Sequence, residues 1–231
     1  MRIILLPGMD GTGILFRPFV QELRKGLPEE VSVQVLSYPA DQVLSYGQLI
    51  EDVARRLPAQ EEIILLAESF SGPIAYALAS RQPRPDPGPD LRGHLSPPAQ
   101  GPYLAAPPRL MGLLMKIPLP TFLLKRVLFD QATTSETVAL FKEAISKVEG
   151  PVLTARMREI TAFHIKRRAL AMPCAYIQAG NDRLIASSHA KEIRAIAPQL
   201  TEIEIPGPHF ILQARPEKSA QVIGEFLNSL L

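Results

Sequence analysis

Several residue types that carry common chemistry are scarce in this 231-residue sequence. Its one cysteine, Cys174, cannot form a disulfide within the chain, which favours a reducing compartment, namely the cytoplasm. Cys174 lies in an apolar run, so we expect it to be a small buried side chain. The four histidines and Cys174 lack metal-ligand spacing, so neither a metal ion nor another cofactor is expected. With 25 basic and 23 acidic residues the formal charge is +2, and no basic run suggests nucleic acid as a partner.

Long hydrophobic runs are also absent. The N-terminal MRIILLPGMDGTG carries a very short apolar run before its glycines, too short for a secretory signal or a membrane span. The length fits one large domain, or one domain with an inserted cap.

Short apolar runs alternate with longer segments of helical spacing. The runs are rich in β-branched residues, and we predict strands at 2–6, 31–38, 62–67, 174–179 and 201–205. Helical spacing follows the first and second runs, and residues 216–231 should form a closing helix that begins at Pro216. This alternation predicts an α/β fold with a mostly parallel sheet and helices on both faces.

Residues 109–170 break the alternation with helical segments alone. We therefore predict a helical cap over 107–170, inserted before the last two strands, which divides the core into 1–106 and 171–231. The first two segments are unusually apolar, which suits either an acyl chain or packing onto the core. Basic side chains among them leave contact with a membrane surface as a weaker alternative. The segments are 110–116, 121–129, 135–146 and 152–165.

Residues 83–108 break the alternation differently, because they contain nine of the 23 prolines. Proline interrupts both helices and central strands. Only a short piece at 91–95 or at 103–106 could form a strand in this stretch. Whether this stretch is a loop insertion or a disturbed strand stays open.

The segment ILLAESFSG has the form of a strand that turns sharply into a helix with Ser69 at the turn. This form is typical of a nucleophile elbow, which needs small residues two places before and two places after the serine. Ala67 and Ser71 meet that need, although glycine is usual at both. The alternative is a polar turn that caps a helix.

A glycine-rich turn, PGMDGTG, follows the first predicted strand. In an elbow enzyme this turn gives the second N–H group of an oxyanion hole, so the donors should be Met9 and Phe70. A phosphate-binding loop is disfavoured because the turn has neither dinucleotide-binding glycine spacing nor a P-loop lysine.

A serine nucleophile needs a base and an acid that orients it. His209 follows the last predicted strand and Asp182 follows the one before, so both should lie at the edge where parallel α/β sheets bind ligands. Asn181 is a competing turn residue but cannot carry a negative charge. The other three histidines fall in the proline-rich stretch or in helical patterns: His94, His164 and His189.

The motifs PGMDGTG, AESFSG, GNDRLI and PGPHFILQARPE, in this order, resemble the α/β-hydrolase family over nearly the whole chain. The pair PG-x-DGTG and ESF-x-G is most similar to bacterial esterase-like proteins that resemble the hydrolase part of plant phytyl-ester and triacylglycerol acyltransferases. Together these residues predict a serine hydrolase that cleaves carboxylic esters or thioesters through an acyl-enzyme on Ser69, with an apolar small-molecule acyl ester as substrate. Acyl transfer to an alcohol, and a lyase or binding protein, remain alternatives.

Overall fold

The structure is a computed structural model, and it describes residues 1–81, 91–94, 120–163, 168–185 and 188–230. In this part of the chain six strands form one sheet in the order β2-β1-β3-β4-β5-β6, and every pairing is parallel. The strands are β1 (Arg2–Leu6), β2 (Ser32–Val35), β3 (Ile63–Ala67), β4 (Leu91–His94), β5 (Cys174–Ala179) and β6 (Leu200–Ile205).

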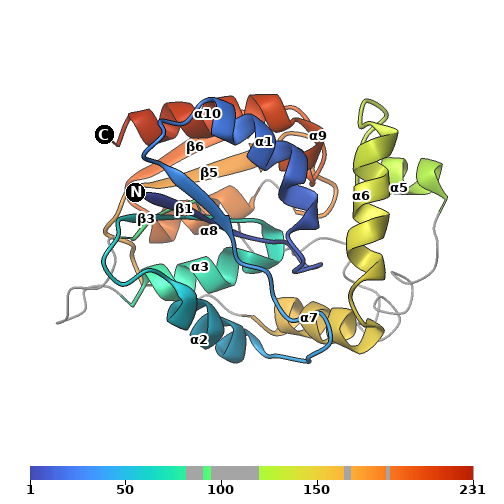
Figure 1. The fold of residues 1–231 in the computed structure, drawn as a ribbon, viewed down its shortest axis with the longest axis horizontal. Helices are drawn as coiled ribbons and strands as arrows, with labels where there is room; N and C mark the ends of the chain where they lie inside the picture. The colour runs from blue at the N-terminus through green and yellow to red at the C-terminus, as the bar shows by residue number, and fades with distance from the viewer. Residues whose placement is uncertain (82–90, 95–119, 164–167, 186–187, 231) are drawn as a thin grey trace.

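Helices cover both faces of this sheet (Figure 1). On one face α1 (Arg17–Lys25) and α10 (Pro216–Asn228) pack side by side over an apolar core that includes Phe19 and Ile223. On the other face α2 (Tyr46–Arg56), α3 (Gly72–Ala79) and α8 (His189–Ile196) share a second core. The alternating apolar runs therefore predicted the layers of the core correctly.

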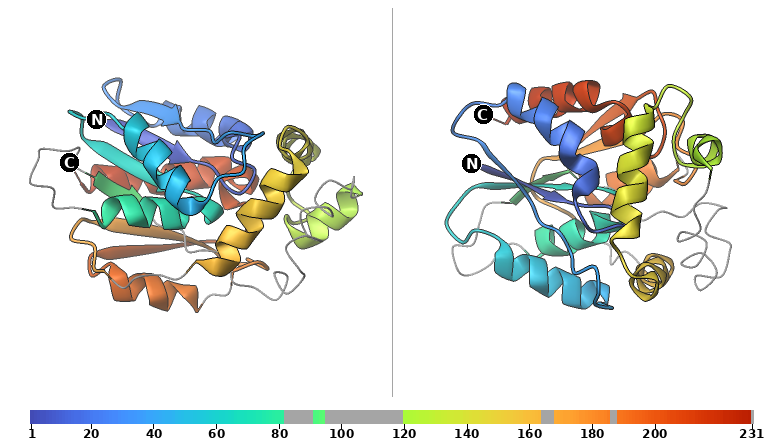
Figure 2. Two further views of the ribbon diagram at one scale, coloured as in Figure 1. Left: turned by 90° about the horizontal axis from the view of Figure 1, so that it is seen from below. Right: turned by 45° about the vertical axis from the view of Figure 1, so that its right-hand side comes forward.

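Between β4 and β5 the described residues form three helices: α5 (Thr121–Val127), α6 (Ser135–Ser146) and α7 (Gly150–Ala162). Figures 1 and 2 show them beyond the carboxyl ends of the strands. The predicted helical segments at 121–129, 135–146 and 152–165 correspond to these helices, whereas 110–116 lies outside the described residues. The boundary at 107 is outside them too, so the predicted domain limits stay a prediction.

The apolar side chains of the insertion partly pack among themselves. Leu124 and Phe129 are buried in a third core with α6, and the Phe129 ring stacks on Phe210 with centroids 5.1 Å apart. Phe122 is 69% exposed. Packing therefore accounts for two of the residues that could have bound an acyl chain. None of the described helices combines the length and apolar character that a transmembrane span requires.

The strand within the proline-rich region is β4, at the first of the two predicted places. It pairs with β3 from Leu91 to His94, but only Gly93 and His94 pair with β5. The second place, 103–106, lies outside the described residues. β4 thus separates β3, which leads to Ser69, from β5, which leads to Asp182.

The strand predicted at 31–38 is shorter in the structure and ends at Val35. Its neighbour β1 ends at Leu6 and turns away, so the last hydrogen bond between these two strands runs from Leu36 N–H to the Leu5 carbonyl. Tyr38 N–H donates instead to the Gly11 carbonyl, at 2.7 Å. The chain after β2 therefore leaves the sheet to hold the glycine-rich turn.

Candidate active site

Ser69 lies at the first residue after a sharp turn from β3 into the short helix η2 (Ser69–Ser71), which continues into α3. Its φ is +48°, and no other non-glycine residue in the described ranges has a positive φ. A left-handed serine is disfavoured, and such strain is concentrated at functional sites. The backbone at Ser69 therefore has the form expected of a nucleophile elbow.

The structure brings Ser69, Asp182 and His209 together from the ends of three strands. The Ser69 Oγ lies 3.0 Å from His209 Nε2, and the Asp182 Oδ2 lies 2.8 Å from His209 Nδ1. The side chains of His209 and Asp182 are only 7% and 13% exposed. With Nδ1 protonated, His209 donates to the carboxylate and can accept the serine proton at Nε2.

The second oxygen of Asp182 is held by the backbone. Its Oδ1 accepts hydrogen bonds from the N–H groups of Leu184 at 2.7 Å and Ile185 at 2.9 Å. Burial raises the pKa of Asp182, but its hydrogen bond to His209, the His209 charge and these N–H groups outweigh burial and lower it. Asp182 is therefore a fixed anion beside the imidazole.

The predicted oxyanion donors, Met9 and Phe70, lie in two turns whose carbonyls are bound within the turns. The Gly8 carbonyl accepts from Gly11 N–H at 3.0 Å, and the Ser69 carbonyl accepts from Gly72 N–H. In a trans peptide the N–H points opposite to the carbonyl of the same unit. The N–H groups of Met9 and Phe70 therefore point out of their turns, and their role as oxyanion donors stays a prediction.

Ser71 joins the two turns. Its hydroxyl donates to the Pro7 carbonyl and accepts from the Tyr38 hydroxyl, whose oxygen is 2.5 Å away. Ser71 is fully buried. The sequence indicated only that a small residue was needed here, and nothing in its pattern pointed to Tyr38, since the contact depends on how the chain leaves β2.

Glu68 is a buried carboxyl group that the sequence pattern did not identify. It lies next to Ser69, is 8% exposed, and its Oε1 has no hydrogen-bond partner among the described residues. A side chain at Gly8 would contact both this carboxyl and that of Asp10, so the two acids face the glycine-rich turn together. Burial raises the pKa of Glu68 to about 7, and Asp10 adds to the increase.

We expect Glu68 to make stability fall as pH rises. The folded protein retains this proton up to about pH 7, whereas the unfolded chain releases it near the ordinary value of 4.5. The contribution of Glu68 to the free energy of unfolding is therefore fully present below pH 4.5 and is lost as the pH rises from 4.5 to about 7. Relative to Glu68→Gln, wild type should lose on the order of 3 kcal/mol of unfolding free energy between pH 4.5 and 8.

Urea unfolding of wild type and Glu68→Gln across this pH range measures the difference. Glu29→Gln, which changes an exposed acid, is the matched control and should follow wild type. A Glu68→Gln curve that runs parallel to wild type at every pH would contradict the expectation.

A small, mostly apolar cavity adjoins Ser69, Asp182 and His209. Its remaining lining comes from β5, α9 (Ile211–Ala214) and the neighbouring turns, namely Glu68, Tyr176, Ile177, Ala179, Ile185, Ile211 and Leu212.

Of the other histidines, His189 is buried in α8, as expected of a packing residue, and the His94 and His164 side chains lie outside the described residues. Cys174 is buried, as predicted.

No protein-family model and no curated protein matches this sequence. Among solved structures, it is similar to the enol-lactonase of Burkholderia xenovorans LB400, with a TM-score of 0.77, 16% identity, and coverage of 98% of this chain and 91% of that one. A carboxylesterase of the thaumarchaeon Nitrososphaera gargenis gives a TM-score of 0.77 at 16% identity, covering 98% and 89%. A thermophilic esterase of Thermogutta terrifontis gives 0.73 at 18% identity, covering 99% and 90%.

These similarities extend over nearly the full length of each pair, at identities that indicate a shared fold alone. The likeness to plant acyltransferases stays a prediction. The sheet order, the helices on both faces and the neighbours agree with the fold predicted from the motifs: the chain has the α/β-hydrolase fold.

Proposed function

We propose that this protein is a serine hydrolase that cleaves carboxylic esters or thioesters through an acyl-enzyme on Ser69. The observation that carries the proposal is the imidazole of His209, which lies within hydrogen-bond distance of both Ser69 Oγ and Asp182 Oδ2. The positive φ of Ser69 supplies the sharp turn that a nucleophile elbow needs, and the outward N–H groups of Met9 and Phe70 supply two donors for an oxyanion. An esterase, a carboxylesterase and a lactonase among the neighbours support the same class of reaction.

The chemistry follows from these positions. His209 Nε2 takes the Ser69 proton while Oγ attacks the carbonyl carbon, and the N–H groups of Met9 and Phe70 stabilise the oxyanion. The imidazolium then protonates the leaving alkoxide or thiolate, which leaves an acyl group on Ser69. Water attacks this ester, its proton passes to His209, and the protonated Ser69 and the free acid are released. Asp182 holds the imidazole in the required tautomer throughout.

The test combines turnover with covalent labelling. Purified protein should hydrolyse p-nitrophenyl esters of graded acyl length, and a fluorophosphonate probe should form one adduct, located on Ser69 by peptide mass spectrometry. Ser69→Ala should take up no probe, whereas Ser135→Ala, at an exposed serine on α6, should label normally. Hydrolysis that survives in Ser69→Ala would sink the assignment, and new ester formed with an added long-chain alcohol would favour the acyltransferase instead.

A further inference from the structure

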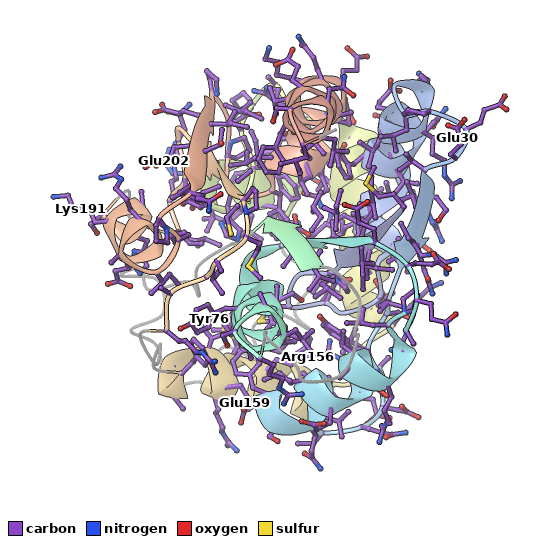
Figure 3. All side chains as sticks on the ribbon, turned by 90° about the vertical axis from the view of Figure 1, so that its left-hand side faces the viewer. Glu30, Tyr76, Arg156, Glu159, Lys191 and Glu202 are labelled. Carbon is purple, nitrogen blue, oxygen red and sulfur yellow. The ribbon has the colours of Figure 1, made fainter. Side chains whose placement is uncertain are left out.

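We propose that helix α7 of the insertion positions both halves of the oxyanion hole, through Arg156 on the Met9 side and through Glu159 on the Phe70 side. This inference rests on the proposed function. Neither residue touches the catalytic triad, so both are positioning residues. Figure 3 shows the two labelled side chains on α7, beside α2 and α3.

Arg156 is a buried cation that binds backbone carbonyls. Its side chain donates to the carbonyls of Met9 at 2.9 Å and Asp10 at 2.7 Å through Nη1, and to that of Pro39 at 2.8 Å through Nη2. The residue is only 2% exposed. The Asp10 carboxyl acts on the guanidinium electrostatically, but the hydrogen bonds of the guanidinium go to three backbone carbonyls, which indicates that fixing those carbonyls is its role.

These bonds determine the orientation of the Met9 peptide units. The unit before Met9 is held by the bond between Gly8 O and Gly11 N–H, and the unit after it is held by Arg156. Gly11 has a φ of +70°, and a side chain there would overlap the guanidinium. The glycine therefore serves two purposes, since it permits the turn and admits Arg156. Without Arg156, one of the two anchors of the Met9 donor is lost.

Glu159, one turn further along α7, acts on the second donor through Tyr46. Its Oε2 accepts the Tyr46 N–H at 2.6 Å, at the first residue of α2. The Tyr46 hydroxyl donates to the Phe70 carbonyl at 2.9 Å, and the two rings stack with centroids 4.8 Å apart. The Arg156 guanidinium also lies over the Phe70 ring, 6.0 Å from its centroid, at the outer range of a cation–π interaction. One helix thus fixes both donor residues.

Because the oxyanion forms only during reaction, loosening its donors should lower kcat and leave KM nearly unchanged. We expect Arg156→Ala to lose about 10²-fold in kcat, comparable to the removal of one oxyanion donor. The affinity for a trifluoromethyl ketone, which mimics the tetrahedral intermediate, should fall in parallel. Millimolar guanidinium should restore part of the kcat, whereas ammonium should not, because only the planar ion can span the carbonyls.

Matched variants separate positioning from general stability. Arg158→Ala removes an exposed arginine from the same helix and should behave as wild type. Tyr46→Phe keeps the ring stack but removes the bond to Phe70, and should lower kcat with KM unchanged. Glu159→Gln retains an acceptor for Tyr46 N–H, so it should keep more activity than Glu159→Ala.

The possible failures are distinct. Wild-type protein that neither hydrolyses esters nor takes up the fluorophosphonate would overturn the proposed function and this inference with it. Active wild type together with an undiminished kcat in folded Arg156→Ala would overturn this inference alone. If Arg156→Ala does not fold, Tyr46→Phe decides: a lower kcat and weaker ketone binding support the inference, and wild-type values of both overturn it.

Discussion

Alanine at Ser69 or at His209 is expected to lower kcat for ester hydrolysis by about 10⁶-fold, the scale seen when a triad nucleophile or base is removed. Without Ser69 there is no oxygen to carry the acyl group. Without His209 the hydroxyl keeps its proton, because Asp182 lies next to the imidazole and not next to Ser69. Steady-state kinetics on the best p-nitrophenyl ester measure the loss.

The double variant Ser69→Ala/His209→Ala provides the sharper comparison. Residues that act as one unit are strongly non-additive, so the double variant should be no slower than either single one. Ser135→Ala should retain wild-type kinetics, and thermal unfolding should show that each variant folds. Losses that multiply in the double variant would mean that the two residues act independently, contrary to the bond between them.

Replacing Asp182 with asparagine is expected to lower kcat by about 10⁴-fold with little change in KM. The N–H groups of Leu184 and Ile185 already bind Oδ1, so an asparagine would keep its oxygen there and turn its NH₂ group toward His209. A donor at that place forces the imidazole to present an unprotonated Nδ1 and a protonated Nε2. That tautomer cannot accept the Ser69 proton.

The control for this change is Asn181→Ser, which alters the exposed neighbour in the same turn and should leave kcat unchanged. The tautomer can be read directly from the ¹⁵N shifts of a histidine-labelled sample, in which Nε2 should become protonated. Wild-type kcat in Asp182→Asn would show that the acid lies elsewhere.

The meeting of Ser69, Asp182 and His209 could be predicted from sequence because each of them follows an apolar strand. In a parallel sheet the carboxyl ends of all strands meet at one edge, so residues 69, 182 and 209 converge whatever the exact strand limits. The strands of the sheet could be predicted because most of them are short apolar runs, except at β4, where prolines interrupt the pattern. At β4 the strand is only Leu91–His94, too short for its pattern to distinguish it from the second candidate.

The residues that support the site could not be predicted. Arg156 looks like one of several charged residues in an amphipathic segment, and its burial depends on three carbonyls that lie more than a hundred residues away in the sequence. Glu68 stands beside Ser69, but its burial depends on a glycine turn from another strand. The spacing of apolar residues indicates which side of a helix or strand is buried. The contacts of Arg156 and Glu68 depend instead on how separate helices, strands and turns pack together.

The left-handed backbone of Ser69 sets stability against the proposed catalysis at a single position. A residue with a side chain is less stable in that conformation than glycine by about 1–2 kcal/mol. Glycine would accept the φ of +48° freely but would bring no hydroxyl to His209. Selection for a more stable chain would therefore favour glycine at 69, and selection for turnover would oppose it, so the serine found there marks a position at which folding free energy has been given up.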